Sequence, residues 1–128
     1  MNPSFFIFNL LYYLSMSIIT WNCQGAKCSK FKLAFKEIVM MHKPNIVAIL
    51  DPCISGLQVE QVICGLGFSN LWFKDAMSFS VGILLLWNEI TQISIQNAGK
   101  QLIHLEWKKG NRNGLLTMVY ATLVHRTC

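Results

Sequence analysis

Short apolar runs separated by a helical stretch dominate the first half of the chain. Residues 17–23 and 46–50 are rich in branched and aromatic side chains, and the runs end near the small polar residues Asn22 and Asp51. The second run (Ile-Val-Ala-Ile-Leu) is continuous rather than alternating, which is typical of a strand covered on both faces in a parallel sheet. Both runs therefore predict buried strands.

Residues 29–42, between these strands, have the periodicity of a helix. Their apolar side chains fall at positions 31, 34, 35, 38 and 39, which share one face. Pro44 cannot continue the helix, and it should hold Lys43 in extended geometry. Strands joined in this way lie parallel, so Asn22 and Asp51 are expected at one rim of the sheet, where open α/β sheets bind their ligands.

A second helix and further strands follow. Ser55 and Gln58 have the spacing of a capping box, and the helix that they begin should continue toward Leu66 until Gly65 or Gly67 stops it. Later segments predict strands at residues 68–74, 81–87, 93–96, 101–108 and 115–121, with a polar Asn-Gly turn within 109–114. The expected fold is therefore α/β, with the order β-α-β-α followed by an antiparallel meander.

Composition sets the scale of this fold and leaves its partners open. The 128 residues suffice for one domain. Charged residues make up 13% of the chain, well below the average of about 25%, so the surface carries little charge. The net charge of +5 suits a polyanion such as nucleic acid, and it also fits a mildly basic solvated surface.

The first fifteen residues are apolar and aromatic, and we expect them to be a leader outside a domain that occupies residues 16–128. No Lys or Arg precedes Lys27, so the positive region of a signal peptide is missing. The apolar run at 5–14 is also shorter than the roughly 20 residues that cross a bilayer. A membrane role is therefore disfavoured, and an intracellular location is favoured.

The cysteines stand at positions 23, 28, 53, 64 and 128, without a CxxC pair. An odd number without metal-ligand spacing disfavours a zinc site. Reduced thiols, as in an intracellular compartment, are expected instead.

An ordered series of short motifs resembles a known family. The motifs lie at residues 18–25 (Ile-Ile-Thr-Trp-Asn-Cys-Gln-Gly), 42–50, 54–56, 66–69, 79–83, 86–88 and 119–121. Their order and spacing resemble the N-terminal half of an endonuclease/exonuclease/phosphatase domain, the fold of DNase I and abasic-site endonucleases. The versions found in plant non-LTR (LINE-type) retrotransposons are the most similar. The resemblance extends from Met16 nearly to the C-terminus.

The resemblance implies a fold and a set of functional residues. The fold would be the N-terminal half of a DNase I-like four-layer α/β sandwich. The family hydrolyses phosphate esters with Mg²⁺, and by this likeness Asn22 would orient the phosphate and Tyr120 would contact it. Asp51 stands where the family has a metal-binding Glu. Nucleic acid would be the partner, with Lys27 and Lys30 among the contacts.

The chain also departs from the family pattern. Asp is one methylene shorter than Glu, which withdraws the carboxylate of Asp51 by about 1.5 Å. The family's later Asp-x-Asn and Ser-Asp-His segments do not occur in these 128 residues. Loss of a general base alone typically costs about 10²–10⁴-fold in rate. The sequence therefore predicts a truncated retrotransposon-derived remnant with little or no catalysis.

Three other functions stay open at this stage. One is a weak Mg²⁺-dependent nuclease or phosphodiesterase. Another is a basic nucleic-acid-binding or interaction fragment that uses Lys27, Lys30, Lys32, Lys43, Lys108, Lys109 and Arg112. The third, which is disfavoured, is a membrane-associated protein that uses the apolar leader. Because most of the partner sheet would be missing from half a sandwich, the apolar face of the meander should be exposed and should promote self-association.

Overall fold

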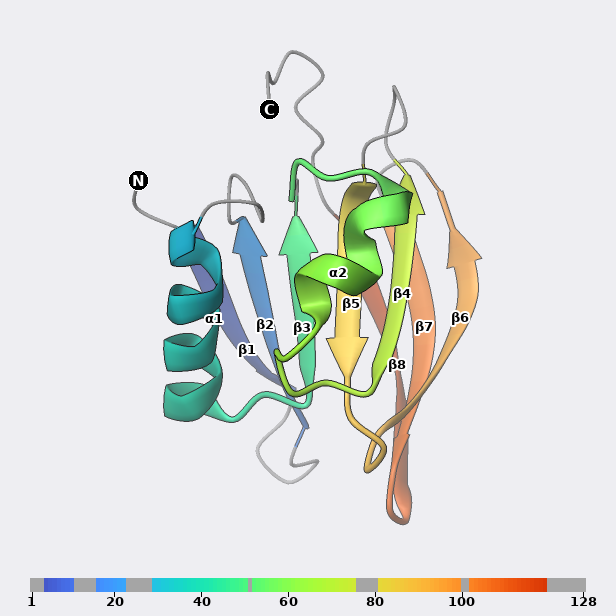
Figure 1. Ribbon diagram of the computed structural model, residues 1–128. Coiled ribbons are helices and arrows are strands. Elements are labelled where there is room, and N and C mark those ends of the chain that lie inside the picture. The colour runs from blue at the N-terminus through green and yellow to red at the C-terminus, as the bar shows by residue number, and fades with distance from the viewer. Residues whose placement is uncertain are drawn as a thin grey trace.

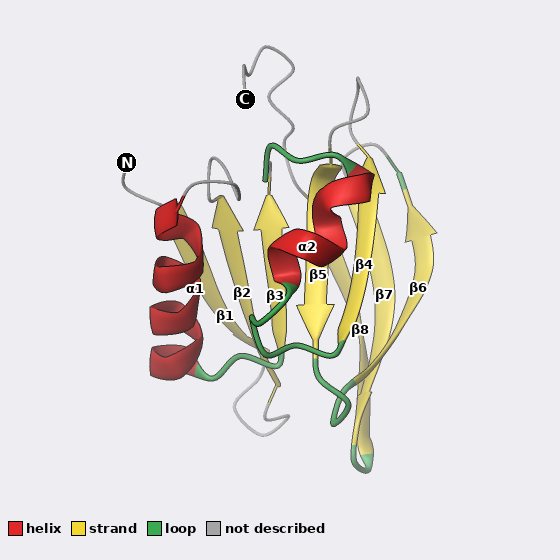
Figure 2. Cartoon of the chain, viewed as in Figure 1, coloured by secondary structure: helices red, strands yellow, loops and turns green. Residues whose placement is uncertain are grey.

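The computed structural model describes residues 4–10, 16–22, 29–50, 52–75, 81–99 and 102–119. These residues form a mixed α/β fold (Figures 1 and 2). Its elements are β1 (Ser4–Leu10), β2 (Met16–Asn22), α1 (Ser29–His42), β3 (Ile46–Leu50), the 3₁₀ turn η2 (Gly56–Gln58), α2 (Val59–Ile63), β4 (Asn70–Asp75), β5 (Val81–Trp87), β6 (Gln92–Ala98), β7 (Leu102–Lys109) and β8 (Arg112–Val119).

Within the described residues the strands form two sheets. The larger has the order β1-β2-β3-β5-β4, and the smaller has the order β6-β7-β8. Strands β2 and β3 are parallel, and the other neighbours are antiparallel. The predicted β-α-β start is therefore confirmed. The predicted meander is confirmed for β6, β7 and β8, which form the smaller sheet. Its first predicted strand, β5, instead lies between β3 and β4 in the larger sheet.

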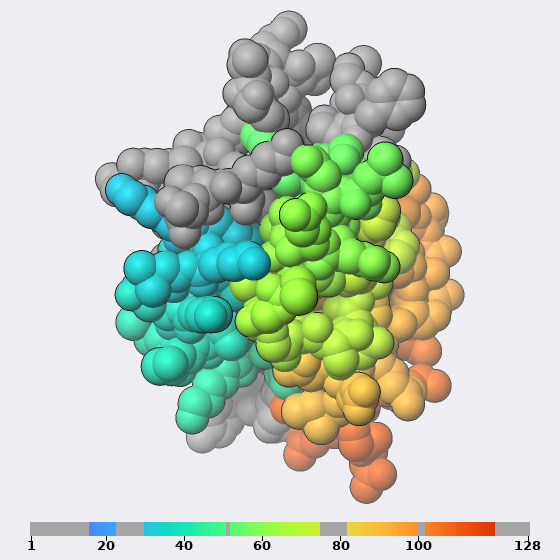
Figure 3. All heavy atoms as spheres, viewed as in Figure 1, coloured from blue at the N-terminus to red at the C-terminus, as the bar shows by residue number. Residues whose placement is uncertain are grey.

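The elements stack in three layers. Helices α1 and α2 lie on one face of the larger sheet, and the smaller sheet lies on the other (Figure 1). Seen from the helix side, α1 and the segment around α2 cover much of the larger sheet (Figure 3). Alternation along β2 serves both layers, because Ile19 and Trp21 pack toward the helices while Met16 and Ile18 pack toward the smaller sheet.

An aromatic cluster fixes α1 on the sheet. The rings of Trp21 and Phe31 stack with centroids 5.2 Å apart and planes within 1°. Phe35, which is completely buried, contacts both rings and meets Phe68 edge-on at 5.8 Å. Such ring pairs add about 0.5–1.5 kcal/mol each beyond their buried area. The apolar stripe predicted for residues 29–42 is therefore the buried face of α1.

The expected exposure of the meander's apolar face is not found. Ile103, Leu105 and Trp107 on β7 are buried against the larger sheet. The reason is that the larger sheet itself supplies the opposing layer, through alternate residues of β2, β3 and β5. Self-association of the chain stays a prediction, without that surface to support it.

Local backbone geometry corrects the predicted end of α1. Lys43 has a φ of 46°, in the left-handed region rather than the extended one. Its N–H donates to the carbonyl of Val39 at 2.8 Å, which is the αL motif that closes many helices. The bond to a terminal carbonyl outweighs the preference that Pro44 imposes.

The second helical segment is shorter than predicted. The capping box is confirmed by the N–H of Ser55, which donates to Oε1 of Gln58 at 3.0 Å. The segment begins as a 3₁₀ turn, and α2 then ends at Ile63 rather than at Leu66. Gly65 and Gly67 follow with φ of 83° and 89°, so the backbone has already left the helix.

The N-terminal segment expected as a leader contains a strand. β1 pairs antiparallel with β2 along its full length, from Ser4 opposite Asn22 to Leu10 opposite Met16. This pairing places β1 at one edge of the larger sheet. The domain boundary at Met16 stays a prediction.

The cysteine expectation is wrong at one position. Cys53 is disulfide-bonded, while Cys64 is free and exposed. An odd number of cysteines rules out complete pairing but not a single bridge. The intracellular location that was favoured with reduced thiols stays a prediction.

The hairpin between β7 and β8 turns earlier than the Asn-Gly signal suggests. Lys109 pairs with Arg112, so the two-residue loop is Gly110-Asn111, and Gly110 has a φ of 61°. Gly114 lies within β8, opposite Trp107. A Cβ on Gly114 would stand 2.7 Å from the indole ring.

We predict that Gly114→Ala destabilises the fold by about 1–3 kcal/mol, because the buried Trp107 ring would have to move. Gly99→Ala is the matched control, since the nearest atom to its Cβ would be 3.9 Å away and its φ is not positive. Urea unfolding of both variants measures the difference. Equal midpoints for the two would contradict the packing described here.

Candidate functional site

The candidate site lies at the shared rim of β2 and β3. The parallel register pairs Ile18 with Ile46 and ends with Asn22 beside Leu50, so both strands stop at the same level. Helix α1 begins at this end of the sheet (Figure 1). The β-α-β unit thus brings the side-chain amide of Asn22, at the end of β2, to the same end of the molecule as the start of α1. Rims of this kind bind ligands in open α/β sheets.

The structure describes two of the predicted site residues. Asn22 is the last residue of β2, and Lys30 is exposed in the first turn of α1. Both lie at the rim end of the molecule. Asp51, Tyr120 and Lys27 lie outside the described residues, so their predicted roles stay untested.

Asn22 carries an unsatisfied polar atom. Its Oδ1 is buried and has no hydrogen-bond partner among the described residues. Leaving such an acceptor unpaired typically costs about 1–3 kcal/mol. By the alternation of β2, the side chain is on the same face as Ile18 and Thr20, which is the face turned toward the smaller sheet.

Asn45 at the opposite end of the strand pair shows the contrast. Its Oδ1 accepts a hydrogen bond from the backbone N–H of Ser17 at 3.0 Å and one from the Ser17 hydroxyl at 3.4 Å. The same amide type is thus fully used as a structural clamp at one end of β2 and β3. At the rim, the amide oxygen of Asn22 is buried without a hydrogen bond.

A groove runs beside the rim between the two sheets. It has a volume of about 230 Å³ and is lined by Ile18, Thr20, Leu50, Leu116, Thr117, Met118 and Val119. Ile18 and Thr20 of β2, Leu50 at the end of β3 and residues 116–119 of β8 border this space, and Asn22 is not among its lining residues. Sequence reasoning missed Thr20, although its position two residues before Asn22 on one strand could have indicated it.

The described residues contain no group of three or more His, Cys, Asp and Glu side chains that could hold a metal ion. Mg²⁺ takes near-octahedral oxygen ligands, and Asn22 Oδ1 supplies one oxygen. No chemical step through a metal follows from this part of the chain.

The basic residues divide between two ends of the molecule. Lys30 lies at the rim, whereas Lys108 and Arg112 lie on the β7–β8 hairpin. That hairpin is near the start of β3, since Lys109 Nζ donates to Asn45 Oδ1 at 3.5 Å. Among the described residues proposed from the sequence, Lys30 and the hairpin cations Lys108 and Arg112 therefore lie at different ends, and the nucleic-acid role of the set stays a prediction.

Comparison with known proteins leaves the family unassigned. A scan against protein-family models finds no match, and a search of curated proteins finds no relative. The helices that the structure describes include none with the length and hydropathy needed to cross a bilayer.

We predict opposite outcomes for the two asparagines when each is replaced by the apolar side chain of similar size. Asn45→Leu should cost about 1–3 kcal/mol, because it leaves Ser17 without its acceptor. Asn22→Leu should be neutral or slightly stabilising, because it removes a buried oxygen that gains nothing. Denaturant unfolding tests both variants. A comparable loss at Asn22 would show that its amide is satisfied within the fold.

Proposed function

We propose that these residues are the N-terminal half of a DNase I-like, Mg²⁺-dependent endonuclease/exonuclease/phosphatase domain of the LINE retrotransposon type. In this proposal the stretch by itself hydrolyses phosphate esters little or not at all. The buried, unpartnered Oδ1 of Asn22 at the common end of β2 and β3 is the observation that carries it. An amide kept at an energetic cost is typical of a residue held for binding.

The arrangement of layers supports the family assignment. The resemblance implies a four-layer sandwich of helices, two sheets and helices. The described residues supply helices, a mixed sheet and a second sheet packed against it. The motif around Asn22 closes a strand parallel to β3, as the resemblance requires.

The proposed role of Asn22 is to orient a phosphate group. Its side-chain N–H groups can donate to a phosphate oxygen. Lys30, exposed at the same end, adds a positive charge within reach of an approaching polyanion. In this proposal Mg²⁺ would neutralise developing charge on the phosphate, with Asp51 as its ligand by resemblance.

We propose that these 128 residues by themselves do not catalyse hydrolysis, because they do not include the family's water-activating groups. The 128 residues contain no Asp-x-Asn or Ser-Asp-His segment. Loss of a general base typically costs about 10²–10⁴-fold in rate, and loss of one charge-stabilising donor costs about 10²–10³-fold. The shorter reach of Asp51 would weaken metal binding further.

Binding without hydrolysis is the second candidate function. It is favoured by the position of Lys30 beside the rim and by the net charge of +5. A weak Mg²⁺-dependent nuclease is the remaining alternative. A plasmid-nicking assay distinguishes this nuclease from the two functions without hydrolysis.

We predict that the purified chain does not nick supercoiled plasmid above background in the presence of Mg²⁺. Asn22→Ala and Asp51→Ala should then leave that background unchanged, and a chain with the exposed Lys36→Ala substitution serves as the control. The readout is the fraction of open-circular DNA on a gel. Nicking that disappears with either site variant, but not with the control, would establish an active enzyme instead.

A further inference from the structure

Strand β1 leaves one edge of the larger sheet open. One side of β1 pairs with β2 along the whole strand, and among the described strands the sheet ends there. An edge of this kind carries a row of backbone N–H and C=O groups that a further strand can bind. The described part of the chain therefore presents a site for strand addition at β1.

The sequence of β1 lacks the features that protect edge strands. Ser-Phe-Phe-Ile-Phe-Asn-Leu contains no charged residue and no proline, and its register with β2 has no bulge. The other edges that the structure describes are protected. Strand β4 has Lys74, Asp75 and a register shift, β6 has a register shift after Ile95, and β8 begins with Arg112. Because charges and bulges block edge-to-edge pairing, β1 is the described edge best suited to a partner.

Helix α1 turns one flank toward this edge. Lys32 Nζ donates to the carbonyl of Cys64 at 3.3 Å, which fixes the flank of α1 that faces α2. At 3.6 residues per turn, Lys30, Glu37 and Met41 lie on the opposite flank. Helix α1 packs on β2, with α2 on its β3 side (Figure 1). The opposite flank therefore lies on the side of β1.

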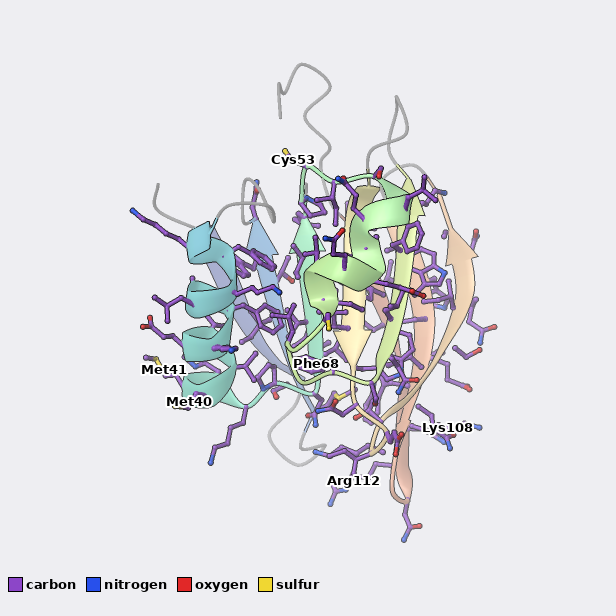
Figure 4. The ribbon with its side chains drawn as sticks, in the orientation of Figure 1. Met40, Met41, Cys53, Phe68, Lys108 and Arg112 are labelled. Atoms are coloured by element: carbon purple, nitrogen blue, oxygen red, sulfur yellow. The ribbon has the colours of Figure 1, made fainter. Side chains whose placement is uncertain are left out.

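A row of exposed apolar and charged side chains follows this flank. Leu33, Met40 and Met41 are 63%, 77% and 73% exposed, and Lys30 and Glu37 are exposed as well. Figure 4 shows Met40 and Met41 on the outside of α1, away from the sheet. The row is continuous, because its successive members are three or four positions apart and such positions are neighbours on a helix surface.

We propose that a second copy of this chain docks here, with the two β1 edges paired antiparallel about a two-fold axis normal to the sheet. Such an axis joins the two larger sheets and places both copies of α1 on one face, antiparallel to each other. Strand β1 begins opposite Asn22, at the rim where α1 also begins. The strand spans about 24 Å and the helix about 21 Å, so one axis passes near the middle of both.

The exposed row of α1 is complementary to itself under this symmetry. An axis near the middle of α1 brings Leu33 within about one helical turn of the partner's Met40 and the partner's Met41. It also brings Lys30 within about one turn of the partner's Glu37, and the symmetry makes this cation–carboxylate pair occur twice. An unrelated strand added to β1 would leave the row on α1 uncovered, so a second copy fits this surface better.

This interface is distinct from the other surfaces described above. It does not use the apolar face of the meander, which is buried inside the fold. It also does not depend on the proposed function, because the pairing involves β1 and the flank of α1 rather than the amide of Asn22.

Sedimentation equilibrium of the full chain at increasing concentration tests the proposal. We expect a reversible monomer–dimer equilibrium. Glu37→Lys should raise the dimer dissociation constant about tenfold, because repulsion replaces attraction at two equivalent pairs. Adding Lys30→Glu to Glu37→Lys restores opposite charges and should bring the constant back to within about threefold of the original. The double variant Leu33→Ser and Met41→Ser should raise it about tenfold or more.

Matched controls change the same residue types outside the contact. Lys36→Glu reverses an exposed charge on the side of α1 nearer to Lys32, and Leu57→Ser removes an apolar side chain that is 97% exposed in η2. Each should change the dissociation constant less than about twofold, because exposed charges beyond about 8 Å are screened.

Backbone hydrogen exchange distinguishes this dimer from other association. The amides of β1 should exchange more slowly in concentrated than in dilute protein, while those of β4 at the other edge should not change. A monomer at every concentration, equal effects of the control variants, failure of the charge swap to restore association, or a dimer without slower exchange in β1 would each overturn the proposal.

Discussion

The parallel pairing of β2 with β3 is the constraint on which the rest of the structure depends. Four successive residues of β3, from Ile46 to Ile49, are almost completely buried. A strand buried on both faces needs neighbours on both sides for its backbone groups and a layer on each face for its side chains. Strands β2 and β5 meet the first need. Helices α1 and α2 and the smaller sheet meet the second.

The same pairing gives the molecule two chemically different ends. At one end, Asn45 uses its amide oxygen to tie the start of β3 to Ser17. At the other end, Asn22 leaves its oxygen buried and unpaired beside a groove between the sheets. The difference between two asparagines on one strand pair is therefore the physical basis of the proposed phosphate site.

Periodicity in the sequence predicted the elements that local pattern decides. The buried stripe of residues 29–42 and the continuous run at 46–50 are both confirmed. The local pattern could not predict which strands pair across the sequence. The apolar run of β5 indicates a buried strand, but it does not determine that β3 and β4 are its neighbours. The polar turn predicted within residues 109–114 is confirmed at Gly110-Asn111, while the Asn113-Gly114 pair lies in β8, with Gly114 opposite Trp107. Of the predicted site, Asn22 and Lys30 are placed at one rim, while Asp51, Tyr120 and Lys27 lie outside the described residues.

The central proposal is that the rim at Asn22 binds a phosphate, while the described residues by themselves do not complete a catalytic metal site. The most direct measurement is an NMR titration that follows the side-chain amide of Asn22 as inorganic phosphate is added, with and without Mg²⁺. The account predicts a saturable shift of the Asn22 amide that Mg²⁺ changes little, while the Asn45 amide, already engaged with Ser17, stays in place. No shift at Asn22, or a shift that requires Mg²⁺, would contradict it.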